Sequence, residues 1–194
     1  PRAAAPPREY DSPRTANPTR DALATAIADL EGGAGATVTA SGMAAITLAC
    51  QLLNPGDLVL APVDCYGGTF RLLNRLAARG LFRLRFIDLA DAAQLAAAEG
   101  EPARLLWVET PTNPLLRIMD LARLRQVAHA CGALLAVDNT FLLTALQRPL
   151  EFGADLVVHS TTKYLNGHSD VVSGAVVARN ASLHDELAAW ANAL

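Results

Sequence analysis

Short apolar runs alternate along the chain with stretches in which apolar residues recur at helical spacing. The apolar runs predict strands at Leu58–Ala61, Leu84–Ile87, Leu105–Val108, Leu134–Val137, Leu156–Val158 and Ala175–Val177. The stretches with helical spacing predict helices at Thr19–Leu30, Met43–Leu53, Phe70–Ala78, Leu121–Ala130, Leu142–Phe152 and Ser182–Leu194. Because continuous apolar strands are buried on both faces, this alternation predicts an α/β fold with a mainly parallel sheet flanked by helices.

The two ends of the chain differ from this alternating central part. Pro1–Pro18 contains five of the 11 prolines and shows no helical period, which predicts an extended arm. The run Glu31-Gly32-Gly33 ends the first predicted helix, whereas the helix predicted at Ser182–Leu194 has no capping signal. We therefore expect an arm at residues 1–18 and one large domain at residues 19–194 that is truncated at its C-terminus.

Composition excludes several classes of protein. The 194 residues are 52% hydrophobic and 18% charged, which is typical of a soluble enzyme with a sizeable core. The net charge of −3 gives little attraction to phosphate backbones, so no nucleic-acid partner is expected. No apolar run approaches the ~20 residues that cross a bilayer, so no membrane partner is expected. Cys50, Cys65 and Cys131 are widely spaced without a CxxC pair, which favours reduced thiols in the cytoplasm over a disulfide framework or a metal site.

Lysine occurs once in the sequence. Of the 16 basic residues, 15 are arginine and the remaining one is Lys163. Arginine can replace lysine as a surface charge, but its guanidinium does not lose a proton in a protein and cannot form an imine. A Schiff-base nucleophile is therefore one role in which lysine has no substitute. The alternative is a lone lysine that survived by chance on the surface, and composition by itself leaves both interpretations open.

Polar groups follow four of the predicted strands. These segments are Asp64-Cys65-Tyr66-Gly67-Gly68-Thr69, Glu109-Thr110-Pro111-Thr112-Asn113-Pro114, Asp138-Asn139-Thr140 and His159-Ser160-Thr161-Thr162-Lys163-Tyr164. In open parallel sheets, ligands bind at the carboxyl ends of the strands. The position of Lys163 among polar groups at one edge of the sheet therefore favours a chemical role for it.

This set of residues has a physical logic if the ligand is pyridoxal 5'-phosphate (PLP), a cofactor that attaches to lysine. Asp138 can pair with the protonated pyridine nitrogen of the cofactor. The run Ser41-Gly42-Met43 opens a helix whose N-terminus favours the phosphate. Hydroxyl groups for the phosphate are available at Ser160 and Thr162. Tyr66 can stack on the ring and Asn113 can reach a ring substituent.

Each of these residues also has a purely structural interpretation. Asp138 can cap a turn, Ser41 can cap a helix, and Tyr66 can belong to the core. Taken singly, these interpretations are at least as good as the functional ones, but together they do not explain why all of the residues share one edge. His129 and His184 fit helix surfaces, whereas His159 and His168 flank the lysine without other metal ligands nearby in the sequence. We interpret all four histidines as structural.

The same segments resemble a known family. The attachment motif is Ser160-Thr161-Thr162-Lys163-Tyr164-Leu165-Asn166-Gly167-His168-Ser169-Asp170, and further matches are Val137-Asp138-Asn139-Thr140-Phe141, Ser41-Gly42-Met43, Tyr66-Gly67-Gly68-Thr69, Thr112-Asn113-Pro114 and Arg14-Thr15-Ala16-Asn17-Pro18-Thr19-Arg20. In this order they resemble the Cys/Met-metabolism enzymes, the cystathionine γ-synthase family. The resemblance runs from about Tyr10 to the end of the chain.

The resemblance implies a fold and a set of roles. The fold is that of the PLP-dependent transferases of fold type I, and the assembly is a homotetramer, a dimer of tight dimers with active sites shared between two subunits. Lys163 is implied as the Schiff-base lysine and proton shuttle, Asp138 as the pyridinium partner, and Tyr66 as the stacking tyrosine and a possible base. The residues implied as the phosphate-binding group are Gly42, Met43, Ser160 and Thr162. Arg14 is implied to reach the phosphate in the neighbouring subunit.

Two departures from the family pattern are visible. The family places a tyrosine two residues before the arginine of the arm, whereas this chain has Ser12 there and its nearest tyrosine is Tyr10. Either Tyr10 takes that role or one contact is lost. In the family, a smaller C-terminal domain carries the arginine that binds the substrate carboxylate. We expect no counterpart of that domain within these 194 residues.

The implied reaction rests on one stretch, Asp64-Cys65-Tyr66-Gly67-Gly68-Thr69-Phe70-Arg71-Leu72. It is most similar to bacterial cystathionine γ-synthases, whereas methionine γ-lyases typically carry a cysteine at position 68. The implied function is replacement of the acyl group of an O-acylhomoserine, most simply O-succinylhomoserine, by cysteine, so the small-molecule substrates are amino acids. Cystathionine γ-lyase and a non-catalytic PLP-binding fragment remain alternatives. A dinucleotide-binding enzyme is disfavoured, because Gly32-Gly33-Ala34-Gly35 follows a helix and lacks the last glycine of GxGxxG.

Overall fold

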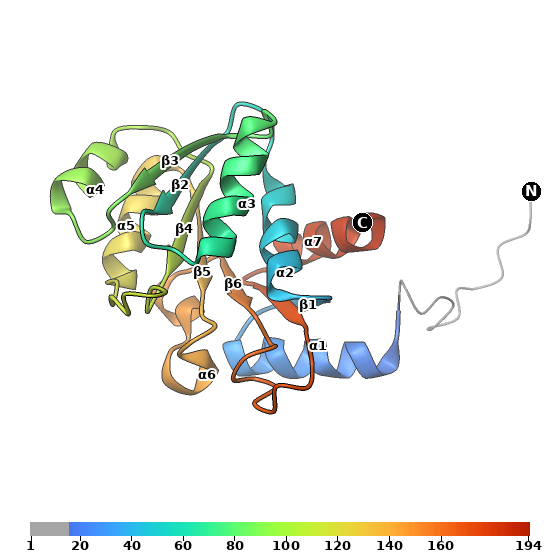
Figure 1. Cartoon of the computed structure of the whole chain (residues 1–194). Coiled ribbons are helices and arrows are strands. Elements are labelled where there is room, and N and C mark those ends of the chain that lie inside the picture. The colour runs from blue at the N-terminus through green and yellow to red at the C-terminus, as the bar shows by residue number, and fades with distance from the viewer. Residues whose placement is uncertain (1–15) are drawn as a thin grey trace, which may run out of the picture.

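A seven-stranded sheet runs through the middle of the computed structural model, which describes residues 16–194 (Figure 1). The strands are β1 (Gly35–Thr39), β2 (Leu58–Pro62), β3 (Arg83–Ile87), β4 (Leu105–Glu109), β5 (Leu134–Asp138), β6 (Leu156–His159) and β7 (Gly174–Ala178). Their spatial order is β1-β7-β6-β5-β4-β2-β3. β7 is antiparallel to β1 and β6, and the other neighbours pair in parallel. The mainly parallel sheet predicted from the sequence is confirmed.

Helices cover both faces of this sheet (Figure 1). They are α1 (Pro18–Glu31), α2 (Gly42–Ala49), α3 (Gly67–Ala78), α4 (Ala92–Glu99), α5 (Leu121–Cys131), α6 (Leu143–Leu146) and α7 (Ala181–Ala193), with 3-10 helices at Cys50–Leu52 and Pro149–Phe152. One buried apolar cluster joins the sheet to α1, α4 and α5, and the other joins it to α2, α3 and α7. Because both faces are covered, β2, β4, β6 and β7 are buried along their whole length.

Local sequence signals account for the limits of α1. The side chain of Asn17 accepts hydrogen bonds from the backbone N–H groups of Thr19 and Arg20, and Pro18 occupies the first helical position. Gly32 ends the helix in the left-handed conformation at φ 75°. The predicted arm lies, except for its last three residues, outside the described part of the chain, and this includes Tyr10, Ser12 and Arg14.

Two predicted helices differ in detail from those observed. The helix predicted at Leu142–Phe152 is wrong as a single element, because α6 ends at Leu146 and a separate 3-10 helix begins at Pro149. Proline lacks an N–H group and disfavours helical geometry in the residue before it, which explains the interruption. The helix predicted at Met43–Leu53 changes to 3-10 geometry at Cys50. β1 and α4 were not predicted.

The order of the strands determines where a ligand can bind. From β2 the chain moves outward to β3 and then returns past β2 to β4. The connections after β2 and β4 therefore diverge, which leaves a crevice at the carboxyl ends of the central strands. This is the edge at which the sequence places its polar segments.

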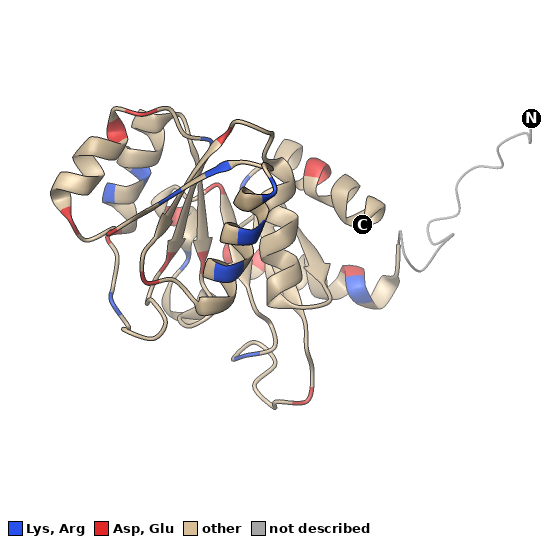
Figure 2. Cartoon of the chain, turned by 45° about the horizontal axis from the view of Figure 1, so that its top comes forward, with Lys and Arg blue, Asp and Glu red and all other residues tan. Residues whose placement is uncertain are grey.

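The surface and the cysteines add two observations. In the view of Figure 2, acidic and basic residues are both spread over the helices and loops instead of gathering by sign. Cys50, Cys65 and Cys131 are free thiols and are buried. Within residues 16–194, no helix combines the length and the apolar character that spanning a membrane requires.

Candidate active site

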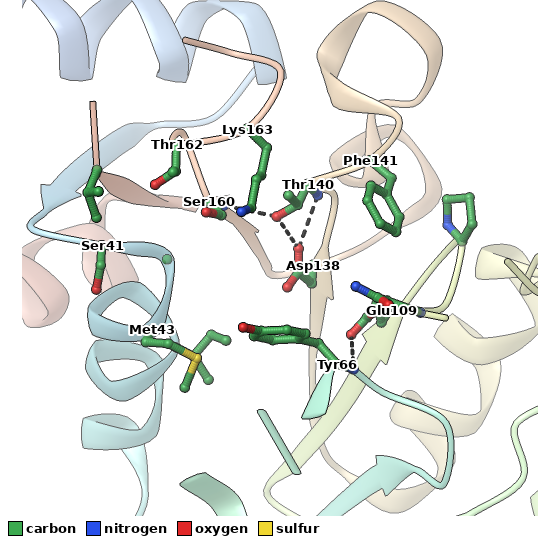
Figure 3. A pocket seen from close by; sticks show the side chains of 15 residues that line it. Ser41, Met43, Tyr66, Glu109, Asp138, Thr140, Phe141, Ser160, Thr162 and Lys163 are labelled. Atoms are coloured by element: carbon green, nitrogen blue, oxygen red, sulfur yellow. Dashed lines mark hydrogen bonds between the residues drawn. The ribbon is translucent and has the colours of Figure 1, made fainter. Parts of the chain in front are cut away.

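A cavity of about 300 Å³ lies at the carboxyl ends of β4, β5 and β6, beside the N-terminus of α2 (Figure 3). Nine of the ten residues predicted for the site line it, and the tenth, Arg14, is outside the described residues. The nine are Ser41, Gly42, Met43, Tyr66, Asn113, Asp138, Ser160, Thr162 and Lys163. Five separate parts of the chain thus meet at one opening, the start of α2 and the four segments that the strand-end argument brings together.

Lys163 stands in a tight turn that follows β6. Its backbone N–H donates to the carbonyl of Ser160 at 3.1 Å, and its carbonyl accepts from the N–H of Gly167 at 2.8 Å. These two bonds hold the backbone on both sides of the lysine. Figure 3 shows the side chain directed into the cavity toward Thr140 and Asp138. An exposed amine at this place can reach a carbonyl group of a bound molecule.

Asp138 is the last residue of β5 and is held by Thr140. One carboxylate oxygen, Oδ1, accepts from the Thr140 N–H at 3.0 Å and from its hydroxyl at 2.5 Å. The hydroxyl oxygen of Thr140 in turn accepts from the Ser160 N–H at 2.9 Å, which ties the end of β5 to the lysine segment. Burial raises the pKa of Asp138, against the opposing effect of the Thr140 hydrogen bonds. A cation beside this carboxylate would stabilise its charged form.

The N-terminus of α2 closely approaches the turn that carries Lys163. A Cβ atom added at Gly42 would lie 2.6 Å from Cβ and 3.0 Å from Cα of Ser160, so only glycine allows this approach. Ser41 caps α2 by accepting from the Ala44 N–H at 3.1 Å, which leaves its hydroxyl proton available. A helix N-terminus with free N–H groups and hydroxyls is suited to an anion.

The hydroxyl of Thr162 is already engaged. It donates to the Ser173 carbonyl at 3.0 Å and accepts from the Ser173 N–H at the same distance. Ser173 in turn donates its hydroxyl to the Thr39 carbonyl at 3.1 Å. In this arrangement Thr162 connects the lysine segment to the residue before β7. Its hydroxyl proton points to the Ser173 carbonyl and is not available for the phosphate contact predicted from the sequence.

Tyr66 borders the cavity on the side opposite Lys163 (Figure 3). It is the N-terminal flanking residue of α3, and 44% of its surface is exposed. A Cβ atom added at Gly68 would lie 2.3 Å from Cε1 of the Tyr66 ring and 2.8 Å from the sulfur of Met43. The ring therefore packs directly over Gly68, where a side chain would displace it.

Glu109 is a cavity residue that the sequence reasoning did not assign. Its Oε2 accepts from the Tyr66 N–H and its Oε1 accepts from the Asn113 N–H, each at 2.8 Å. Burial, followed by the charge of Asp138, raises the pKa of Glu109 to about 8. A charged residue that ends an otherwise apolar strand was the signal that could have identified it. Thr140 was likewise named in its segment without a role.

His159 faces away from the cavity. Its Nε2 lies 2.6 Å from Oε1 of Glu31, and both side chains are fully buried. The same Glu31 oxygen accepts from the side-chain N–H of Asn139 at 3.1 Å. This buried group joins α1 to the ends of β5 and β6, in keeping with the structural interpretation of the histidine.

With this geometry established, comparison with known proteins identifies the family. The model of the Cys/Met metabolism PLP-dependent enzymes matches residues 3–194. The chain belongs to this family. Pyridoxal phosphate is the cofactor of the family, so the family resemblance, the cofactor and the fold class expected from the sequence are confirmed.

The relatives include enzymes with different reactions. The cystathionine γ-synthase of Escherichia coli (strain K12) is 54% identical over 187 residues, which are 96% of this chain and 48% of that protein. The cystathionine β-lyase of Lactococcus lactis subsp. cremoris is 42% identical over 188 residues, or 97% of this chain and 50% of that protein. The chain thus spans about half the length of the curated relatives it matches.

Solved structures agree with the fold. The cystathionine γ-synthase of Xanthomonas oryzae pv. oryzae in complex with aminoacrylate and cysteine superposes with a TM-score of 0.95 at 56% identity, covering 96% of this chain and 49% of that chain. The cystathionine γ-lyase of Lactobacillus plantarum complexed with L-serine gives a TM-score of 0.93 at 38% identity, covering 100% of this chain and 51% of that chain.

The cavity fits the family cofactor on two structural observations. The carboxylate of Asp138 has a raised pKa and would be stabilised by a protonated ring nitrogen. The close approach at Gly42 brings the N-terminus of α2 to the lysine segment, which is suited to a phosphate.

Proposed function

We propose that the protein carrying this chain catalyses γ-replacement, in which the thiol of cysteine displaces the acyloxy group of an O-acylhomoserine. The simplest such substrate is O-succinylhomoserine, which gives cystathionine and succinate. The observation that carries the cofactor chemistry is the position of Lys163, the single lysine, whose amine points into a cavity bordered by Asp138 and Tyr66. The choice of γ-replacement rests on the similarity of residues 64–72 to bacterial cystathionine γ-synthases. The identities of 54% and 56% to two cystathionine γ-synthases support this member of the family over the lyases, to which the identities are between 38% and 45%.

Lys163 and Asp138 carry the central roles in this proposal. The ε-amine of Lys163 would hold the cofactor and would serve as the base that moves protons at Cα and Cβ of the substrate. Asp138 pairs with the ring nitrogen, and Thr140 fixes the orientation of its carboxylate. When bound, the cofactor supplies an electron sink for the carbon skeleton of the substrate amino acid.

The remaining cavity residues bind and orient. Tyr66 covers the ring and is a second candidate base, and Asn113 contacts a ring substituent. The phosphate is held by the N-terminus of α2 together with the turn before Lys163, a group that comprises Ser41, Gly42, Met43, Ser160 and Thr162. For Thr162, this role requires that its hydroxyl leave the Ser173 carbonyl or that its backbone N–H take part.

The assembly and location are further parts of the proposal. Arg14 on the N-terminal arm reaches the phosphate of a neighbouring subunit, so that a tight dimer shares its active sites and two dimers form a homotetramer. The family resemblance of the arm supports this. The cytoplasm is the proposed location, and the three free, buried thiols support it.

Borohydride reduction tests the attachment. The purified yellow holoenzyme is reduced and digested, and the pyridoxyl mass is expected on the peptide that contains Lys163. Lys163→Arg keeps the charge and is the matched control, in which no peptide should carry the mass. A pyridoxyl group on another nucleophile, or a parent protein that never takes up the cofactor, would refute the assignment.

A comparison of two substrates tests the reaction. O-succinylhomoserine with cysteine is offered to the holoenzyme in one tube and cystathionine in another. Succinate should be released faster than cysteine and 2-oxobutanoate. The reverse ranking would favour cystathionine γ-lyase, the second candidate. The similarity of the Lactobacillus plantarum cystathionine γ-lyase over 100% of this chain supports that alternative.

A visible absorption spectrum separates both enzymes from a non-catalytic cofactor carrier. Addition of the amino-acid substrate should change the absorption of the bound cofactor within the holoenzyme, because the substrate amine would enter the cavity in which Lys163 holds the cofactor. A spectrum that is unaffected by every substrate named above would favour the carrier and contradict the proposed catalysis.

A further inference from the structure

Glu109 joins two segments of the cavity that are far apart in the sequence. Its two carboxylate oxygens accept from different backbone N–H groups, Oε2 from Tyr66 and Oε1 from Asn113, both at 2.8 Å. Tyr66 precedes Glu109 by 43 residues and flanks the N-terminus of α3, whereas Asn113 lies in the loop after β4. One carboxylate therefore fixes the backbone position of both residues.

The location of Glu109 makes these bonds strong. It is the last residue of β4 and pairs in register with Asp138 on the neighbouring β5. Only 5% of its surface is exposed to solvent. At a pH above about 8, where Glu109 is ionised, hydrogen bonds from N–H groups to its carboxylate are stronger than those between neutral groups, and burial shields them from water. The carboxylate consequently has a better-defined position than a surface side chain would have.

A second contact restrains the Tyr66 segment from outside the cavity. Asp64, two residues before Tyr66, forms an ion pair with Arg117 at 3.3 Å, and Arg117 also pairs with Asp88 at 2.7 Å. Arg117 belongs to the same loop as Asn113, since its carbonyl accepts from the Thr112 N–H at 3.0 Å. The two loops are thus joined by Glu109 inside and by Arg117 at the surface.

We propose that Glu109 is a positioning residue, which acts on the cofactor through Tyr66 and Asn113. Each of its two carboxylate oxygens fixes the backbone of one of these residues. The inference rests on the proposed cofactor roles of Tyr66 and Asn113. A loosened Tyr66 stacks poorly on a ring, and a displaced Asn113 no longer reaches its substituent. Glu109 itself need not touch the cofactor.

Glu109→Gln is the main variant, because it keeps the size of the side chain and removes one of the two acceptors. The amide oxygen can still accept from one N–H group, but the amide nitrogen is a donor facing a second donor. Titration of pyridoxal phosphate into the apo-protein at a pH above about 8, where the parent Glu109 is ionised, should show a dissociation constant raised about tenfold, the equivalent of one charge-assisted hydrogen bond. The circular dichroism of the bound cofactor should fall with it.

Two further variants separate positioning from a general loss of stability. Asp155→Asn is the matched control, since Asp155 is also a buried carboxylate that accepts from a backbone N–H, that of Leu135 at 2.9 Å, at the opposite end of the sheet. It should lower stability and leave cofactor binding unchanged. Glu109→Asp keeps the charge but is too short to reach both N–H groups, and it replaces the glutamine variant if that variant fails to fold.

A double-mutant comparison tests the route of the effect. In a protein that carries both Tyr66→Ala and Asn113→Ala, adding Glu109→Gln should change the dissociation constant less than twofold, roughly the limit for uncoupled sites. The same tenfold loss in both backgrounds would show that Glu109 acts by another route and would overturn the inference. So would a Glu109→Gln protein that binds the cofactor as the parent does. A parent that binds no pyridoxal phosphate would instead remove the proposed function and this inference together.

Discussion

Gly68 offers a direct test of whether Tyr66 stacks on the cofactor. A Cβ atom at this position would lie 2.3 Å from Cε1 of Tyr66 and 2.8 Å from the sulfur of Met43. Non-bonded carbon atoms need about 3.5 Å, so Gly68→Ala requires the ring to move by roughly 1.2 Å. The ring is free to move, because 44% of the Tyr66 surface is exposed.

The two effects of this substitution have opposite signs. Gly68 lies in the first turn of α3, where alanine is favoured over glycine by up to about 1 kcal/mol. The free energy of unfolding of the apo-protein should therefore stay the same or rise. Aromatic stacking contributes about 0.5–1.5 kcal/mol, so losing it should weaken cofactor binding roughly 2- to 13-fold.

The assay compares urea unfolding of the apo-protein with titration of pyridoxal phosphate for the parent, Gly68→Ala and Gly67→Ala. Gly67 is the matched control in the same helical turn, because its added Cβ would meet only the end of the flexible Arg71 side chain, at 3.3 Å. Gly67→Ala should share any gain in stability and bind the cofactor as the parent does. Equal cofactor affinity in the Gly68 and Gly67 variants would refute the stacking role of Tyr66.

Three further predictions follow from the charges of the site. Asp138→Asn removes the proposed ionic partner of the ring nitrogen and should raise the dissociation constant of pyridoxal phosphate at least about tenfold; an unchanged titration would contradict the pairing. Folding raises the pKa of Glu109 from 4.5 to about 8, so between these pH values the folded apo-protein retains a proton that the unfolded chain releases. The free energy of unfolding should therefore fall as the pH rises from 4.5 to about 8. Urea titrations of Glu109→Gln should lack this component, and parallel pH profiles of variant and parent would refute it. Arg14→Ala should weaken cofactor retention during dialysis and Ser12→Tyr should strengthen it, whereas equal retention in Arg14→Ala and the parent would rule out the shared site for this arm.

The sequence by itself was sufficient where the signals are local. Apolar runs located six of the seven strands, because a strand buried on both faces needs no polar alternation. The run Glu31-Gly32-Gly33 marked the end of α1 through capping, whereas the capping role of Asn17 at its start was not predicted. Lys163 could be singled out because imine chemistry excludes arginine, and its place at a strand end made the edge of the sheet the expected site.

The tertiary structure decided the contacts that depend on distant parts of the chain. β1 was missed because its pairing is with β7, so its short sequence carries little signal of its own. Glu109 could be seen at a strand end, but its bond to the N–H of a residue 43 positions earlier follows only from the adjacency of β2 and β4. The roles of Gly42 and Gly68 could not be predicted from the sequence, because they depend on which group occupies the space of the missing side chain. Ser160 occupies that space at Gly42, and the Tyr66 ring occupies it at Gly68. Such spatial neighbours are set by the packing of the sheet, because hydrophobic burial fixes which strand ends meet and local propensity does not.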